Sequence, residues 1–592
     1  MEHNPCLLLL ADGPVFDDDC VPLERFLEFG VVTGLTYNII SRNFFLSPSF
    51  ALFTCNNQQR MPNAEESASA DDLMTEEIGE MRQRRARTTE MGEPVPRRVE
   101  RKQPKPATEW TKAIAMSLGL TMLFVVFSLN RRGKFLSRKT SDFKSFDKCN
   151  LATYPMWKID EVQELNLSKC DHVHLPDDVE VWSKFKSLKK LDLSGNSLGD
   201  LPMAMEILAP SLEILFLSGN KFTKLPDVIK KLTKLRVLSM RDNFLTELST
   251  DGLPVSSLVW LILTNNQIAR IYPNIKDLKL LRKLMLSHNS LSEIPVELGE
   301  CKDLELVRLA NNNLNAIPTE VLLLPKLGWM SLSGNPIFAS NTPSNGAKII
   351  KEQDVEINKT KILGQGASGV VYAGQYAGKD VAVKVFKEQS KGSDGNPEDE
   401  LAINSIIDHT FAISALGVIE INRKKEMMVM NLLKGTHPLG KVPSFETVTR
   451  DAGPSPESKK IFDEEILLRT VWNVASALEY IHSSVGVSHG DVYLHNILID
   501  GERVSRLSDW GASFAYDRGS IEQAELIEKI EVLAFGRLMQ DLFLWNPKII
   551  APGGVHDLIN QIVQPDTSRR PNFRAVKEHL SAIPEMSAIV NA

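Results

Sequence analysis

The stretch Leu363-Gly364-Gln365-Gly366-Ala367-Ser368-Gly369-Val370-Val371 opens the part of the sequence that decides the fold. Its three glycines allow a loop backbone to approach a ligand without interference from side chains. The run Val381-Ala382-Val383-Lys384 follows and places a lysine at the end of an apolar strand. Together these stretches predict a loop that binds phosphate groups, with the positive charge of the lysine close to them.

Two further motifs lie downstream. His489-Gly490-Asp491 is followed by Asn496, five residues after the aspartate, and Asp509-Trp510-Gly511 comes next. A single Asp or Asn in a loop usually serves the turn itself. In this order, and together with the glycines and the lysine, these residues instead indicate a site that handles the phosphates of a nucleotide.

This set of motifs resembles the catalytic domain of protein kinases, and the resemblance covers roughly Ile357 to Leu580. Tyr372 and the apolar strands are most similar to the tyrosine-kinase-like group, whose members mostly phosphorylate Ser and Thr. The resemblance implies a two-lobed α+β fold, ATP and Mg²⁺ as cofactors, and phosphoryl transfer to a protein hydroxyl. It also implies that positioning and charge do most of the chemistry.

The resemblance assigns a role to each matching residue. Asp491 is expected to accept the proton of the substrate hydroxyl, and Lys384 to pair with Glu400 or, as the alternative, Glu398. The expected catalytic residues are therefore Asp491, Lys384 and Glu400. The expected nucleotide-binding residues are Gly364, Gly366, Gly369, Val371, Lys384, Met430 and Leu432. Asn496 and Asp509 are the expected metal ligands.

Several positions depart from the kinase pattern. Gly490 stands where many kinases carry Arg, Trp510 replaces the usual Phe, and Glu531 replaces the usual Asp. Only 19 residues separate Gly511 from Glu531, and they contain no Ala-Pro-Glu. Arg570 matches the arginine that would pair with that missing glutamate. The nucleotide half of the expected site is complete, whereas the peptide-binding half is shortened.

A repeat precedes the kinase-like region. Asparagines that close an L-x-x-L-x-L-x-x-N pattern recur at intervals of 24 and then 23 residues. They are Asn196, Asn220, Asn243, Asn266, Asn289, Asn312 and Asn335. The pattern and its period resemble the leucine-rich repeat, an α/β solenoid in which the leucines stack inward and the asparagines satisfy backbone groups. We therefore expect seven or eight repeats over residues 150–340 and a kinase domain over 350–592.

Some strand positions of the repeats point outward and are not needed for folding. An apolar band is predicted there, formed by Ile214, Phe216, Val237, Trp260, Ile262 and Trp329. Exposed apolar patches of this kind mark binding surfaces. The band predicts a protein partner or substrate on the concave face of the repeats, and the alternative is that a flanking segment or the kinase domain itself packs there.

The N-terminal part divides into three segments. Residues 1–60 form an extension of uncertain origin, and the charged residues 61–111 predict disorder because they cannot bury enough apolar surface. Residues 113–129 read AIAMSLGLTMLFVVFSL without a charge. As a helix this run would be about 26 Å long, against a hydrocarbon core of about 30 Å. We therefore predict a single transmembrane helix over 112–130, with a buried core helix as the alternative.

Composition sets wider limits. The net charge of -7 is mild, which argues against nucleic-acid binding by the whole chain. The six cysteines show no paired or metal-type spacing, which favours a reducing compartment. Because the predicted span precedes both the repeats and the kinase-like region, and because ATP is cytosolic, both are expected on the cytosolic side of a membrane.

These observations predict a multidomain, membrane-anchored, ATP-dependent protein kinase, with Ser and Thr favoured as acceptors and the repeats choosing the partner. Two alternatives belong to other classes. A pseudokinase would bind nucleotide or act as a scaffold without transfer, which the shortened segment after Gly511 favours. An adaptor would work through its repeats alone and would bind no nucleotide.

Overall fold

The computed structural model describes residues 149, 151 and 159–590, except for gaps at 171–172, 174, 339–346, 367, 388–391, 393, 396, 422–423 and 520. All the described residues belong to one compact unit, so the repeats and the kinase-like region are in mutual contact. The predicted extension, charged segment and transmembrane helix (residues 1–60, 61–111 and 112–130) lie outside the described residues. Within the described ranges, no helix is both long and apolar enough to cross a membrane.

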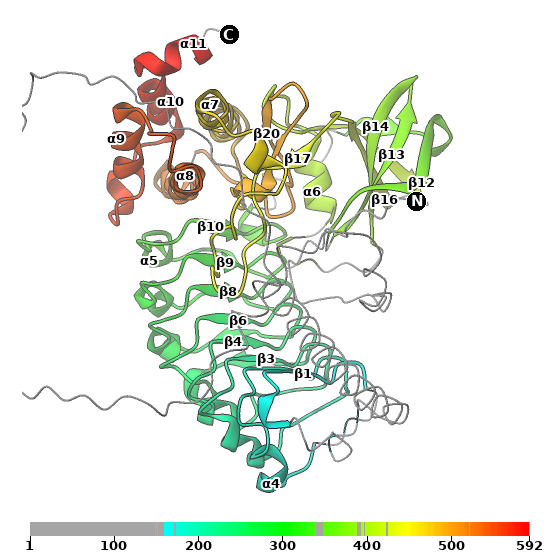
Figure 1. Ribbon diagram of the computed structural model, residues 1–592, viewed down its shortest axis with the longest axis vertical. Coiled ribbons are helices and arrows are strands. Elements are labelled where there is room, and N and C mark those ends of the chain that lie inside the picture. Colours follow the sequence, from blue (N-terminus) through cyan, green and yellow to red (C-terminus); the bar gives the residue numbers. More distant parts are fainter. Residues whose placement is uncertain are drawn as a thin grey trace, which may run out of the picture. The chain divides into compact units, whose positions relative to one another are not determined.

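The repeats form a parallel sheet in which each coil adds one three-residue strand (Figure 1). In order across the sheet, the strands are β1 (Glu164–Asn166), β2 (Lys190–Asp192), β3 (Ile214–Phe216), β4 (Val237–Ser239), β6 (Trp260–Ile262), β8 (Lys283–Met285), β9 (Leu306–Arg308) and β10 (Trp329–Ser331). A second small sheet joins β5 (Glu247–Leu248) to β7 (Arg270–Ile271). The return segments are mostly 3-10 turns, with short helices α4 (Val179–Trp182) and α5 (Thr319–Leu322). The predicted solenoid is confirmed.

The recurring asparagines tie neighbouring coils together. The side-chain nitrogen of Asn266 donates to the carbonyl of Leu263 in its own coil and to that of Met240 in the preceding coil, both at 3.0 Å. Its side-chain oxygen accepts from the backbone N–H of Leu245, also at 3.0 Å. Because buried backbone groups without partners are costly, this ladder explains why the repeat needs Asn at that position.

The cysteines correct one prediction. Cys149 and Cys170 form a disulfide at the N-terminal end of the repeats, with their Cα atoms 5.3 Å apart. Two of the cysteines therefore pair, although their spacing in the sequence did not indicate it. The spacing of 21 residues is not diagnostic on its own, because the pairing depends on how the first coil folds back. Disulfides persist mainly in oxidising compartments, so this one counts against the predicted reducing environment. Cys301 is free and buried.

The N-terminal lobe of the kinase-like region is a six-stranded sheet in the order β11-β15-β16-β14-β13-β12. Its elements are β11 (Ile349–Ile350), β12 (Val355–Gln365), β13 (Gly369–Tyr376), β14 (Lys379–Phe386), helix α6 (Pro397–Asn404), β15 (Ala415–Ile421) and β16 (Lys424–Asn431). The glycine-rich stretch forms the turn between β12 and β13. The antiparallel pairing of β12, β13 and β14 places this turn beside Lys384 on β14.

The C-terminal lobe is mainly helical (Figure 1). Its helices are α7 (Glu464–Tyr480), α8 (Ile521–Leu544), α9 (Gly553–Ile562), α10 (Phe573–Ser581) and α11 (Ser587–Val590). Short strands lie beside them: β17 (His437–Pro438), β18 (Val487–Ser488), β19 (Ile497–Ile499), β20 (Ser505–Leu507) and β21 (Phe514–Ala515). The two predicted lobes are therefore present, and the segments between β18 and β21 carry the two downstream motifs.

Replacing Asn266 with Ala should weaken the repeats, because the substitution leaves three buried backbone groups on two neighbouring coils without this partner. We expect a loss of about 2–4 kcal/mol, from a net value of about 1 kcal/mol for each hydrogen bond plus the desolvation of the orphaned groups. Thermal unfolding of the full chain measures this loss. Asn315→Ala is the matched control, because Asn315 is exposed and makes only one long contact, at 3.4 Å. Equal melting temperatures for the two variants would contradict the ladder's role.

Candidate active site

The turn between β12 and β13 has open space around two of its glycines. A Cβ atom added at Gly364 or Gly366 would meet no atom within 4 Å. At Gly369, in contrast, it would collide with the backbone carbonyl of Val385 on β14. Gly369 is therefore required by strand packing, whereas Gly364 and Gly366 leave space for a ligand. The expected pocket residues Val371, Met430 and Leu432 lie on β13, at the end of β16 and just after it.

Lys384 and Glu400 form an ion pair between β14 and α6. Their side chains are only 12% and 3% exposed, so the pair is nearly sealed from water. Burial alone would lower the pKa of Lys384, but the carboxylates of Glu400 and Asp509 outweigh it and raise that pKa. The lysine therefore stays charged, and the structure selects Glu400 over the alternative Glu398 as its partner.

The segment after β18 holds Asp491 in place. The side-chain nitrogen of Asn496 donates to the backbone carbonyl of Asp491 at 2.9 Å and to its Oδ2 at 2.8 Å. His489 is buried, and burial lowers its pKa, which keeps the imidazole neutral. Its Nε2 lies 3.0 Å from the carbonyl oxygen of Ser508, and its Nδ1 accepts from the backbone N–H of Asp491. The local hydrogen bonds thus fix both the loop and its aspartate.

Glu531 anchors the same loop from helix α8. Its carboxylate accepts from the backbone N–H groups of Gly490 at 2.6 Å and His489 at 3.0 Å. It also accepts from Ser488 Oγ at 3.1 Å and lies 2.6 Å from His482 Nε2. Burial favours the neutral acid, but these hydrogen bonds outweigh it and lower the pKa of Glu531. Glu531 is therefore a charged carboxylate that accepts hydrogen bonds from the backbone of the Asp491 loop and holds that loop in place.

Asp509 and Asn496 are the residues that could hold a metal. Within the described ranges, no three His, Cys, Asp or Glu side chains form a metal-binding cluster. Mg²⁺ commonly binds one or two protein oxygens together with substrate phosphates, which fits this donor set. Asn496 Oδ1 accepts no hydrogen bond among the described residues. Asp509 has a φ of +62°, an uncommon conformation for a residue other than glycine that is often kept at functional sites.

Trp510, in the position usually held by Phe, makes a contact that Phe could not. Its indole Nε1 donates to the carbonyl oxygen of Ile413 at 2.8 Å, and the ring lies 4.9 Å from that of His489. The side chain is buried, so the hydrogen bond compensates the buried N–H. The exchange thus ties the Asp509 segment to the N-terminal lobe.

Four residues of the apolar band on the repeats pack against the kinase-like region: Phe216, Trp260, Ile262 and Trp329. Phe445, in the segment between β17 and α7, packs on Phe216 and Trp260 with ring centroids 5.8 and 5.6 Å apart. Ile262 and Trp329 belong to the same hydrophobic cluster as the core of the C-terminal lobe. The alternative, in which the kinase domain itself packs on this face, is the arrangement found.

The contact continues into the Asp491 segment. Trp329 stacks on Tyr493 with ring centroids 4.5 Å apart and planes 1° from parallel. Its Nε1 donates to the carbonyl oxygen of Val492 at 3.0 Å. Arg308, on β9, forms an ion pair with Asp491 and donates to the carbonyl oxygen of Gly490 at 2.8 Å. The repeats therefore contact the residue expected to act on the substrate hydroxyl.

This contact explains the glycine at position 490. Gly490 has a φ of +74°, and a Cβ there would lie 2.5 Å from the carbonyl oxygen of Met330 and 2.7 Å from that of Ala512. An arginine cannot occupy the position while β10 is so close. Sequence reasoning found this departure but missed its cause, and it missed Arg308 altogether. The available signal was a charged residue at a strand position whose neighbours in the adjacent repeats, Met285 and Ser331, are uncharged.

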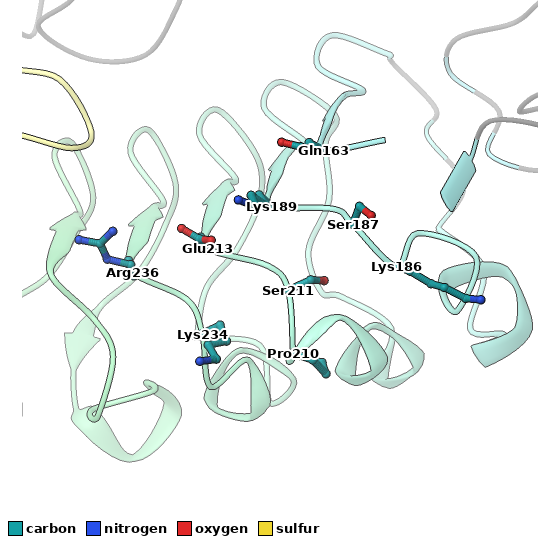
Figure 2. Close-up of a pocket in the computed structure, with 9 residues that line it drawn as sticks. All are labelled: Gln163, Lys186, Ser187, Lys189, Pro210, Ser211, Glu213, Lys234 and Arg236. Carbon is teal, nitrogen blue, oxygen red and sulfur yellow. The ribbon is translucent and has the colours of Figure 1, made fainter. Parts of the chain in front are cut away.

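A separate, open pocket lies on the N-terminal repeats (Figure 2). Its lining residues are Gln163, Lys186, Ser187, Lys189, Pro210, Ser211, Glu213, Lys234 and Arg236. Four of these are basic and one is acidic. None of them belongs to the kinase-like region, so this pocket has no part in the nucleotide site.

Replacing Glu531 with Gln should loosen the loop that carries Asp491, because the amide keeps the size but loses the charge that two backbone N–H groups contact. Hydrogen bonds to charged groups contribute about 1.5–3 kcal/mol each, so we expect a loss of roughly 3 kcal/mol. Thermal unfolding checks this value. Glu525→Gln, an exposed position on the same helix, should change little. A full loss in that control, or none at Glu531, would contradict the anchoring role.

Comparisons with known proteins agree with this geometry. Residues 357–526 match the protein kinase domain family, and residues 186–245 and 279–337 match the leucine rich repeat family. Among similar proteins, a probable serine/threonine-protein kinase of Dictyostelium discoideum is 28% identical over 171 residues, which are 29% of this chain and 11% of that protein.

Two further relatives carry kinase names. The megakaryocyte-associated tyrosine-protein kinase of Mus musculus is 25% identical over 37% of this chain and 47% of its own length. Wall-associated receptor kinase-like 6 of Arabidopsis thaliana is 28% identical over 28% of this chain and 25% of its own length. The chain thus spans from about a tenth to about half of the length of these relatives. It carries leucine-rich repeats followed by a protein kinase domain.

Proposed function

We propose that this chain is an ATP-dependent protein kinase that transfers the γ-phosphoryl group to Ser or Thr side chains. The single observation that carries the proposal is the assembled charge set of the two lobes. The carboxylate of Asp509 acts on the buried Lys384–Glu400 pair, and the side chain of Asn496 donates to Asp491. A pure scaffold has no physical need to keep all five groups in one register.

In the proposed reaction, the acceptor hydroxyl oxygen forms a bond to the γ-phosphorus while the bond from that phosphorus to the β–γ bridging oxygen breaks. Asp491 accepts the hydroxyl proton, and the products are ADP and a phosphorylated side chain. Lys384 places its charge beside the nucleotide phosphates, and Asn496 and Asp509 would hold the metal. Mg²⁺, when bound, neutralises charge on the phosphate oxygens.

The choice of Ser or Thr is supported by the kinase names of relatives such as the one from Dictyostelium discoideum, although the mouse relative is named a tyrosine kinase. The membrane location remains a proposal that rests on the uncharged run at 113–129. The proposed cytosolic orientation of the repeats and the kinase domain rests on the need of a kinase for ATP. The disulfide between Cys149 and Cys170 counts against that orientation.

We propose that the repeats recognise the kinase domain of the same chain through their apolar band, because Phe445 and the C-terminal core already cover that band. The predicted docking of a separate protein on Phe216, Trp260 and Trp329 would require this contact to open. A scaffold that binds nucleotide without transfer is the second candidate. It is favoured by the shortened segment after Gly511 and by the ion pair that occupies Asp491.

Phosphate transfer by the full chain tests the proposal. The assay uses [γ-³²P]ATP with Mg²⁺ and a mixture of Ser-, Thr- and Tyr-containing peptides. Asp491→Asn should lower transfer by about 10²-fold or more, because general base catalysis contributes about 10²–10⁴-fold. Lys384→Met should lower both transfer and the thermal shift that Mg-ATP produces. Asp517→Asn, an exposed position in the segment before α8, is the matched control and should behave as wild type.

The results of the transfer assay and of the thermal shift distinguish a kinase, a nucleotide-binding scaffold and an adaptor. Transfer that disappears in the Asp491 and Lys384 variants establishes the kinase. A thermal shift with Mg-ATP but no transfer from the wild-type chain would contradict the proposal and support the nucleotide-binding scaffold. The absence of both would leave an adaptor that works through its repeats.

A further inference from the structure

Among the described residues, Asp491 has no ion-pair partner within its own loop, where His495 pairs with Asp451 instead. Between His489 and Asn496 the sequence is Gly-Asp-Val-Tyr-Leu-His, without Lys or Arg. Oδ2 of Asp491 accepts from Asn496, and its Oδ1 pairs with Arg308 from the repeats. The cation nearest to the proposed catalytic aspartate therefore comes from another domain of the chain, 183 residues away in sequence.

Because Arg308 is buried, its guanidinium group depends on the partners that surround it. Its side chain is only 3% exposed, and a buried guanidinium is very costly unless each charge-bearing group is paired. Besides Asp491 and the carbonyl of Gly490, its Nε lies 2.6 Å from Oδ1 of Asp394. Burial would lower the pKa of Arg308, but Asp394 and Asp491 outweigh it and raise that pKa, so the group stays charged.

Asp394 links Arg308 to a second part of the kinase domain. It lies in the segment just before α6, the helix that carries Glu400. Arg308 thus bridges the N-terminal lobe, at Asp394, and the loop of Asp491 in the C-terminal lobe. A planar guanidinium with several donors in a fixed geometry suits such a bridge better than the single ammonium of lysine.

Two glycines in the kinase domain allow the repeats to come this close. At Gly490 a Cβ would lie 2.5 Å from the carbonyl oxygen of Met330 on β10. At Gly395 it would lie 2.8 Å from Oγ of Ser333 and 2.5 Å from the carbonyl of Gly511. Both lobes therefore leave room for the same edge of the repeats, which favours a permanent contact over an occasional one.

The repeats also bind Arg570, the arginine that a longer segment after Gly511 would be expected to contact. Arg570 is 2% exposed and matches the arginine that would pair with the missing glutamate of Ala-Pro-Glu. Its Nη2 instead donates to the carbonyl oxygen of Pro325, in the last repeat, at 2.6 Å. Together with Trp329, which stacks on Tyr493, this contact joins the repeats to both Arg570 and the Asp491 loop.

We propose that Arg308 is a positioning residue of the kinase active site, which holds the Asp491 carboxylate and ties it to the N-terminal lobe through Asp394. This inference rests on the proposed function. The repeats then form part of the active site, supplying the support that the short segment between Gly511 and α8 does not. A removable lock would use the same ion pair, but the burial of Trp329 in the core of the C-terminal lobe argues for a fixed element.

Steady-state transfer by the full chain tests this inference, using [γ-³²P]ATP, Mg²⁺ and the best peptide of the mixture. For Arg308→Ala we expect kcat to fall by about 10²-fold with the KM for ATP unchanged, because a small displacement of a catalytic group costs about that much. Arg308→Lys keeps the charge and should recover part of the loss. The lysine variant also provides the test of positioning if the alanine variant does not fold.

Arg282→Ala is the control at the same interface. Arg282 pairs with Glu305 at 3.0 Å and contacts Thr449 at 3.3 Å, so it joins the two domains without touching Asp491. We expect its kcat to match wild type even if its melting temperature falls. A purely structural role for Arg308 would lower the melting temperature in both variants and leave kcat unchanged in both.

The outcomes separate this inference from the proposed function. An active wild-type chain with unchanged kcat in Arg308→Ala would overturn the inference alone. Transfer that rises in Arg308→Ala would also overturn it and identify the contact as an inhibitory lock. A wild-type chain that binds Mg-ATP without transferring phosphate would overturn the proposed function, and with it any role of Arg308 in catalysis.

Discussion

The ion pair between Arg308 and Asp491 is the interaction on which the rest of the arrangement depends. A guanidinium that is 3% exposed is tolerable only because two carboxylates and a backbone carbonyl surround it. These partners come from both lobes of the kinase domain, so the buried charge fixes the repeats, the Asp491 loop and the segment before α6 relative to one another. Removing Arg308 would leave the carboxylates of Asp394 and Asp491 without their shared cation.

Two departures of this kinase domain from the usual pattern follow from its contact with the repeats. Gly490 is small because the backbone of β10 passes over it, and Arg570 donates to a repeat carbonyl because its usual partner is missing. Part of the apolar band of the repeats, which in isolation suggests a docking site for another protein, instead extends the core of the C-terminal lobe through Trp260, Ile262 and Trp329. The repeats and the kinase domain thus belong to one compact unit.

Local patterns in the sequence predicted much of this structure. The period of Asn196 to Asn335 was sufficient for the solenoid, because each asparagine serves backbone groups in its own and neighbouring coils. The nucleotide half of the site was also predictable, since Lys384, Glu400 and the glycines lie on adjacent elements. The pairing of Arg308 with Asp491 leaves no local pattern, because these residues are 183 positions apart. The Cys149–Cys170 disulfide was missed because it depends on how the first coil folds back.

Hydrogen–deuterium exchange of the full chain, with Trp329→Ala beside wild type, tests most directly whether the repeats hold the active site together. Trp329 donates to Val492 and stacks on Tyr493, so its loss should increase amide exchange in residues 487–496 as well as in β10. Faster exchange in both segments is the predicted result. Faster exchange confined to the repeats, with residues 487–496 unchanged, would contradict the account and leave the two domains as independent modules.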